Sequence, residues 1–216
     1  MARRTKEEAL ATRHRLLDAA ETLFQARGVS RTSLQDIATQ AGATRGAIYW
    51  HFKDKADLFN AMMERVTLPL ERSWQPGQPG RGELARDALA ELRTAILRAM
   101  SLLTSDARLR CVVDIAMQKV EYVDELHAVR ERHLRVRDQC IADIAQALRL
   151  AARQGGHRLP LPATQAANGL HALIDGLIRN WLLEPAAFDL PVLTEQVVDV
   201  YLAGLGLRPA TRPRNN

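Results

Sequence analysis

The sequence predicts an all-α protein of about nine helices, with a small N-terminal domain and a larger helical body. Apolar residues recur at intervals of three and four along most of the 216 residues, which is the helical period. Alternating β-branched runs bounded by turn residues, which are typical of strands, are absent from the sequence. Proline and glycine cluster in residues 73–83 and 155–162, so these segments are expected to be loops between helices.

The first helix is predicted over residues 6–27. Thr5 and Glu8 have the spacing of a capping box, in which a hydroxyl and a carboxylate satisfy the free amides of a helix start. The apolar residues that follow have helical spacing, and Gly28 supplies a stop signal. Arg3, Arg4 and Lys6 lie ahead of this helix or at its start, where they could either enter a minor groove of DNA or remain in solvent.

Two short helices joined by a glycine-containing turn are predicted next, which describes a helix-turn-helix. A capping box read from Thr32 to Gln35 opens a helix over 33–40. Gly42 can adopt the left-handed conformation in the turn at no steric cost, and Thr44 reads as the N-cap of a helix over 44–52.

The rest of the chain is expected to form longer helices. Asp54 is predicted to cap a helix that runs to about residue 73, and Pro69 is expected to kink or fray its last turn. We expect three domains or segments: a DNA-binding unit over 1–55, a helical body over 56–207 and a disordered tail over 208–216. The remaining predicted helices cover residues 83–104, 106–121, 124–154, 163–184 and 191–206.

Composition limits the classes of function. The net charge of +5 and the pI of about 9.7 favour polyanionic partners, although many basic proteins only have solvated surfaces. Cys111 and Cys140 are far apart without a CxxC pair or Cys/His cluster, so no metal or cofactor is expected. The charged N-terminus and the lack of an 18-residue apolar run predict a cytoplasmic protein that does not enter a membrane.

The segment TRGAIYWHF, residues 44–52, concentrates four ring side chains in one predicted helix. Ile48 and Phe52 are four residues apart, and facing inward they would pin this helix to the one before it. A helical wheel then turns Gly46, Ala47 and Trp50 outward. A helix with so few apolar residues on its outer side is suited to contact a partner.

If this second helix enters a major groove, its residues are expected to have different roles. Arg45 at its first turn can bind a guanine through two hydrogen bonds, Gly46 permits close approach, and Ala47 leaves space for a thymine methyl group. Tyr49 and His51 can bind phosphates, whereas Trp50 is expected to contact sugar or methyl groups. Helix starts also favour phosphate, and the residues expected there are Thr32, Ser33, Thr44 and Lys55. For Thr44, Tyr49 and His51, purely structural roles remain open.

Residues 1–59, above all SLQDIATQAG and TRGAIYWHFKDKADLF, resemble the DNA-binding domain of the TetR family of bacterial repressors. The opening MARRTKEEALATR…LLDAAETLF is similar to the multidrug-efflux regulators of the AcrR and TtgR group. Ala43 departs from the valine common there, which affects packing rather than function. The resemblance implies a repressor that binds palindromic double-stranded operator DNA and is released by a hydrophobic small molecule.

The resemblance also implies that the helices over 163–184 and 191–206 pair with those of a second copy, although an intramolecular core would explain their apolar faces equally. Asp175 and Arg179 are four residues apart, so they could form an ion pair within the helix or line the effector pocket, as in the similar regulators. The apolar walls of that pocket are expected from Leu92, Ile96, Val113 and Met117.

Three alternatives stay open at this point. A TetR-type regulator of unrelated metabolic genes, or a helical small-molecule binding module, would fit most of these features. An enzyme built on the aromatic cluster fits less well, because no acid or nucleophile is placed beside His51 and no GxSxG motif occurs.

Overall fold

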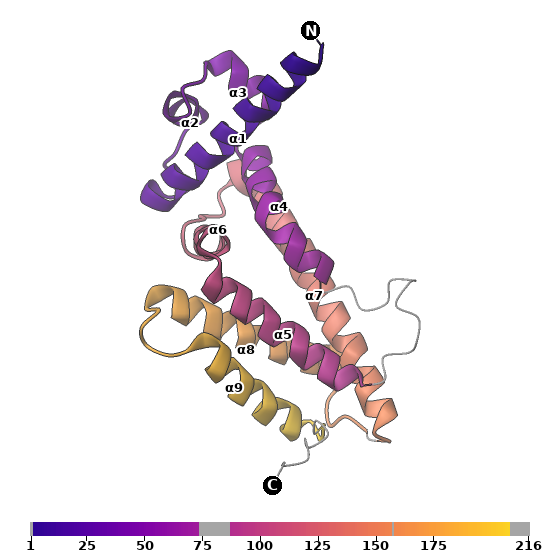
Figure 1. Ribbon diagram of the computed structural model, residues 1–216. Helices are drawn as coiled ribbons and strands as arrows, with labels where there is room; N and C mark the ends of the chain where they lie inside the picture. Colours follow the sequence, from indigo (N-terminus) through magenta and orange to yellow (C-terminus); the bar gives the residue numbers. More distant parts are fainter. Residues whose placement is uncertain (1, 74–86, 157, 208–216) are drawn as a thin grey trace. The chain divides into compact units, whose positions relative to one another are not determined.

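The computed structural model describes residues 2–73, 87–156 and 158–207, and within them it is all-α (Figure 1). Three predicted segments lie wholly or partly outside the described residues. They are the predicted loops at positions 74–83 and 157, the start of the helix predicted over 83–104, and the tail over 208–216. The described helices are α1 (Ala2–Arg27), α2 (Leu34–Gln40), α3 (Arg45–His51), α4 (Lys55–Ser73), α5 (Ala88–Ser105), α6 (Ala107–Gln118), the short 3-10 helix η1 (Asp124–Leu126), α7 (His127–Gln154), α8 (Ala163–Leu183) and α9 (Leu190–Gly204).

Two helix starts differ from the predictions. Helix α1 begins at Ala2, because Ala2, Arg3 and Arg4 are good helix formers that extend it ahead of Thr5. Arg3 and Arg4 therefore belong to α1 rather than to an arm ahead of it. Helix α2 is capped one residue later than predicted: the Ser33 hydroxyl accepts from the Asp36 amide at 3.1 Å, and the Asp36 carboxylate accepts from the Ser33 amide at 3.0 Å.

Other local signals are confirmed. The Thr44 hydroxyl accepts from the Ala47 amide at 3.2 Å at the start of α3, and Asp54 accepts from the Asp57 amide at 2.8 Å at the start of α4. Gly42 has a φ of +63°, the left-handed conformation predicted for the turn between α2 and α3. Helix α4 continues through Pro69 to Ser73.

The chain divides into two compact units, each with its own apolar core. The N-terminal unit contains residues 1–69 and 106–135, and α1 to α4, α6, η1 and the beginning of α7 form its core. The C-terminal unit contains residues 70–105 and 136–216, and its core combines α5, the later part of α7, α8 and α9. Packing thus joins α6 to α1 in one core, although the two are far apart in the sequence.

Candidate nucleic-acid interface

Helix α3 is anchored to the N-terminal unit by one side only. Ile48 and Phe52 are buried, as predicted, and they belong to the same core as Ile37 and Ala38 of α2. Phe52 also ends the helix, where its amide donates to the Ile48 carbonyl oxygen. The two short helices lie beside α1 in Figure 1. This anchoring leaves the opposite face of α3 uncovered.

The uncovered face of α3 carries polar and aromatic groups. Arg45, Gly46, Tyr49 and Trp50 are exposed, and Trp50 reaches 73 % exposure. The Arg45 guanidinium carbon lies 5.8 Å from the centre of the Tyr49 ring, a cation–π distance that holds both side chains together. Ala47 is half-buried. The exposure of this face agrees with the predicted interface, and the individual contacts with DNA stay predictions.

His51 occupies the edge of this face. Its ring packs edge-on against Trp50 at a centroid distance of 4.6 Å. Partial burial lowers the pKa of His51 below its usual value of 6.5, and the nearby charge of Arg13 lowers it further. The imidazole is therefore neutral at pH 7 in the unbound protein, with a proton acceptor and a donor available.

Helix α2 begins at Ser33, whose exposed hydroxyl is engaged by Asp36. The hydroxyl donates to the Asp36 carboxylate at 2.7 Å as well as capping the helix. These hydrogen bonds lower the pKa of Asp36. Ser33 therefore lies at the predicted surface but uses its hydroxyl locally.

Two residues predicted to bind phosphate lie inside the protein instead. Thr32 is 1 % exposed, because its hydroxyl donates to the Gly28 carbonyl oxygen at 2.8 Å. Lys55 is 5 % exposed, since its ammonium donates to the Ser30 carbonyl oxygen at 3.3 Å and pairs with Glu125 at 3.2 Å. Neither side chain offers an exposed donor to a phosphate. Lys55 still begins α4, so only its backbone amide can serve there.

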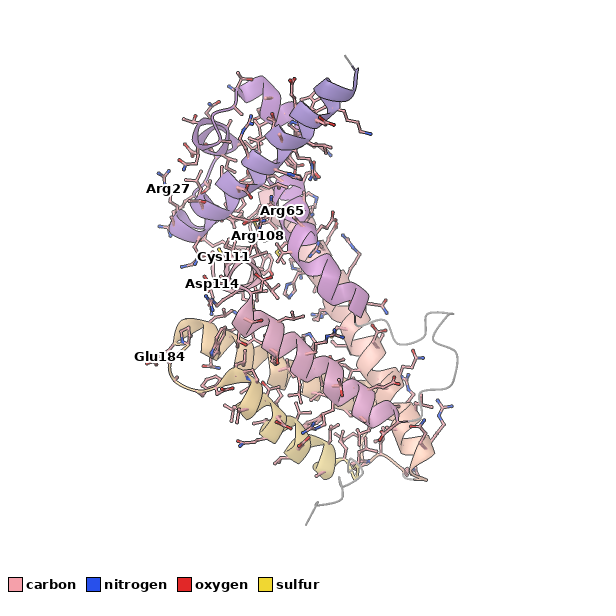
Figure 2. The ribbon with its side chains drawn as sticks, in the orientation of Figure 1. Arg27, Arg65, Arg108, Cys111, Asp114 and Glu184 are labelled. Atoms are coloured by element: carbon pink, nitrogen blue, oxygen red, sulfur yellow. The ribbon has the colours of Figure 1, made fainter. Side chains whose placement is uncertain are left out.

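Polar contacts fix α1 to α4 and α6 within the N-terminal unit. Arg65 of α4 and Arg108 of α6 both bind Asp18 and Glu21 of α1. Figure 2 labels Arg108, Cys111 and Asp114 on α6. These three residues follow one another at intervals of three, so they lie on one face of α6. Cys111 and Asp114 contact Gln25 of α1, and the side-chain nitrogen of Gln25 donates to the Asp114 carboxylate at 2.9 Å. None of these contacts was predicted, since their partners are distant in the sequence.

Arg13 of α1 is a further residue that the sequence analysis missed. Its guanidinium carbon lies 5.2 Å from the centre of the Phe52 ring, at the end of α3. The sequence gives no spacing signal for this contact, because α1 and α3 meet only in the folded unit.

The residues predicted to line an effector pocket are divided between the two units. Leu92 and Ile96 are buried in the core of the C-terminal unit. Asp175 and Arg179 lie on α8 of the same unit and form an ion pair with 3.8 Å between nitrogen and oxygen. Val113 and Met117 lie half-buried on α6 of the N-terminal unit. Their common role in ligand binding stays a prediction.

Two family models match the chain. Residues 16–62 match the model "Bacterial regulatory proteins, tetR family", and residues 87–206 match "MAATS-type transcriptional repressor, C-terminal region". The chain belongs to the TetR family. The family resemblance drawn from residues 1–59 is thereby confirmed, and with it a regulator of transcription rather than an enzyme.

Relatives within the TetR family match along almost the whole chain. The transcriptional regulator TtgR of Pseudomonas putida is 41 % identical over 98 % of this chain and 100 % of its own length. The crystal structure of NalD, the secondary repressor of the MexAB-OprM multidrug efflux pump in Pseudomonas aeruginosa, has a TM-score of 0.81 at 35 % identity, covering 94 % of this chain and 100 % of NalD. A complex of SmeT with triclosan has a TM-score of 0.74 at 31 % identity, covering 94 % and 100 %; SmeT represses the SmeDEF multidrug efflux pump of Stenotrophomonas maltophilia.

The two TetR-family matches cover separate parts of the chain. The N-terminal match includes α2 and α3, and the C-terminal match includes α5 to α9.

Among residues 2–73, 87–156 and 158–207, no group of His, Cys, Asp and Glu is arranged to hold a metal ion. Within the same ranges, none of the helices combines the length and the apolar character needed to cross a membrane.

Proposed function

We propose that this TetR-family protein represses a multidrug-efflux operon and leaves its operator when a hydrophobic small molecule binds. The observation that carries the proposal is the exposed outer face of α3, held outward by the buried residues Ile48 and Phe52. The similar proteins NalD and SmeT suggest the kind of operon, since each represses a multidrug efflux pump. A regulator of this kind acts on DNA in the cytoplasm.

Operator recognition would begin at the N-terminal end of α3, which enters the major groove. Arg45 would bind a guanine through two parallel hydrogen bonds, while Gly46 and Ala47 leave room for base edges and a thymine methyl group. Tyr49, His51 and the starts of α2 and α3 would bind phosphates, and Trp50 would contact sugar or methyl groups. The base contacts would provide specificity and the phosphate contacts position.

A homodimer through α8 and α9 would present two such helices to a palindromic operator. Residues 173–178 of α8 are all half-buried, so no side of these turns is fully covered within one chain. Leu183 at the end of α8 and Val200 of α9 are 70 % and 74 % exposed. A second copy would remove these apolar surfaces from water.

Release would come from an effector bound in the helical body. Triclosan, the ligand named with SmeT, is a small apolar molecule of the class we expect. Leu92 and Ile96 would offer apolar contacts, and the Asp175–Arg179 pair a polar one. The effector must favour the conformation that does not bind the operator, typically by roughly 1–3 kcal/mol.

The test is a gel-shift assay with DNA from upstream of the protein's own gene, with and without hydrophobic drugs. We expect a shifted band at moderate salt that a subset of the drugs abolishes. If no shift occurs, operator binding at this promoter is wrong. If the shift persists with every drug, the release half of the proposal is wrong.

A further inference from the structure

Arg13 of α1 contacts Phe52 at the end of α3, within the N-terminal unit. Its guanidinium is placed over the ring of Phe52, with 5.2 Å between the guanidinium carbon and the ring centre. Phe52 is 2 % exposed and belongs to the core, whereas Arg13 is half-buried. A fixed ring therefore positions a partly exposed cation at the edge of the α3 face.

Stacking occupies the face of the guanidinium and leaves its edge available. The five N–H groups of an arginine lie in the plane of the guanidinium and point away from its edge. Within the described part of the chain, Arg13 forms neither an ion pair nor a hydrogen bond. Three other arginines of the described residues bind two carboxylates each: Arg65, Arg93 and Arg108.

Arg13 also lies near His51. Burial and, after it, the positive charge of Arg13 lower the pKa of His51, so the two side chains are close enough to interact. Lys53 is exposed, two residues after the end of α3 and next to the exposed Asp54. A planar donor group with unused N–H groups at the edge of the α3 face matches the geometry and charge of a phosphate.

We propose that Arg13 is a further DNA-binding residue, held over Phe52 so that its guanidinium edge donates to a backbone phosphate beside the end of α3. The inference rests on the proposed binding of operator DNA through α3. A phosphate is the expected target because bases are read from the N-terminal end of such a helix, whereas Arg13 lies at the opposite end. Arg13 thus contributes affinity and position rather than sequence specificity.

The experiment measures operator affinity of the full-length protein as a function of salt concentration. The plot of log K against log salt has a negative slope, and each lost phosphate contact should make it shallower by about 0.9. A dimer contains two copies of Arg13, so Arg13→Gln should make the slope shallower by about 1.8. We expect Arg13→Gln to weaken binding to operator and to mismatched DNA by the same factor. Arg13→Lys keeps a point charge and should retain most of the slope.

Arg15→Gln is the matched control. Arg15 is exposed and lies two residues further along α1, on a different face of the helix. Its guanidinium donates to the Thr12 hydroxyl at 3.1 Å. Arg15→Gln changes the net charge by the same amount as Arg13→Gln. This control should keep the wild-type slope, and thermal unfolding should show that all variants fold. A wild-type slope for Arg13→Gln would overturn the inference and leave Arg13 as a packing partner of Phe52. Failure of the wild-type protein to bind DNA would instead overturn the proposed function on which the inference rests.

Discussion

Trp50 of α3 and Val200 of α9 are equally exposed, at 73 % and 74 %, but their neighbours differ. Trp50 packs against His51 and follows Tyr49, whose ring Arg45 contacts, so hydrogen-bonding groups lie around its apolar surface. On the exposed side of α9, Val200 lies between Gln196 one turn earlier and Ala203 and Gly204 one turn later, so its neighbours are uncharged. The neighbours, rather than the exposure of one apolar side chain, are the basis of the two proposals: a polyanion at α3 and an apolar surface of a second copy at α9.

The anchoring of the two surfaces also differs. Helix α3 has seven residues and is fixed by Ile48, Phe52 and its cap at Thr44. Helices α8 and α9 are longer and pack along each other, where the Tyr201 hydroxyl donates to the Ala166 carbonyl oxygen at 2.8 Å. Arg93 of α5 further binds Glu195 and Asp199 of α9. A short helix is sufficient to present a few side chains to DNA, whereas a dimer interface needs a large rigid surface.

The largest effect is expected from a charge placed on the α9 surface. Val200→Glu would bury an unpaired carboxylate in each half of the proposed dimer, at a cost of roughly 3–5 kcal/mol for each charge. We expect dimer affinity to fall by at least about 1,000-fold and operator binding to be lost. Analytical ultracentrifugation and fluorescence anisotropy with operator DNA would measure the two losses.

Val136→Glu is the control for this prediction, because Val136 of α7 is an exposed valine outside α8 and α9. It should leave both the dimer and DNA binding intact. A Val200→Glu protein that remains dimeric would show that the exposed apolar face of α9 has another purpose.

A smaller effect is expected from the first turn of α3. Arg45→Ala should weaken operator binding by about 1–3 kcal/mol for each half-site and relax the preference for guanine there. Arg45→Lys should keep the charge but lose the paired hydrogen bonds, so specificity should fall more than non-specific binding. Anisotropy titrations with operator and single-base variants would test this. Unchanged specificity in both variants would remove Arg45 from the base-reading residues, while the dimer should be unaffected in either case.

The sequence predicted most of the helices and the orientation of α3, because both depend on local periodicity. Ile48 and Phe52 are four residues apart, and Thr44 and Asp54 cap the helices that follow them, so no distant contact is needed. The capping box of α2 shows the limit of local patterns. Thr32 and Ser33 both have a suitable residue three positions later, and the choice of Ser33 becomes visible only when Thr32 is seen to bind Gly28.

The errors in the site have a common origin in tertiary contacts. The pairing of Lys55 with Glu125 joins the start of α4 to η1, and no local pattern connects these two residues. The stacking of Arg13 on Phe52 is missed for the same reason. Local patterns predict which side of a helix is apolar, but they do not predict which polar side chains fold inward to a partner.

The smallest expected effect is a pH dependence that separates the α3 surface from the rest of the protein. The pKa of His51 is lowered in the folded, unbound protein by burial and by Arg13. A bound phosphate would raise this pKa, so binding would take up a proton. Operator affinity should therefore increase as the pH falls through the interval between the two pKa values, by up to about tenfold per pH unit for each His51.

The free energy of unfolding should show the opposite sign. Because the folded state holds the pKa of His51 below 6.5, the unfolded chain binds more protons between the folded-state pKa and about 6.5. The contribution of His51 to stability therefore decreases as the pH falls below about 6.5. His51→Asn removes the titrating group, so subtracting its pH profiles from those of the wild-type protein isolates His51 from the other histidines. If His51→Asn leaves the pH dependence of operator affinity unchanged, His51 does not bind phosphate, and fewer residues of α3 contact the DNA backbone than we propose.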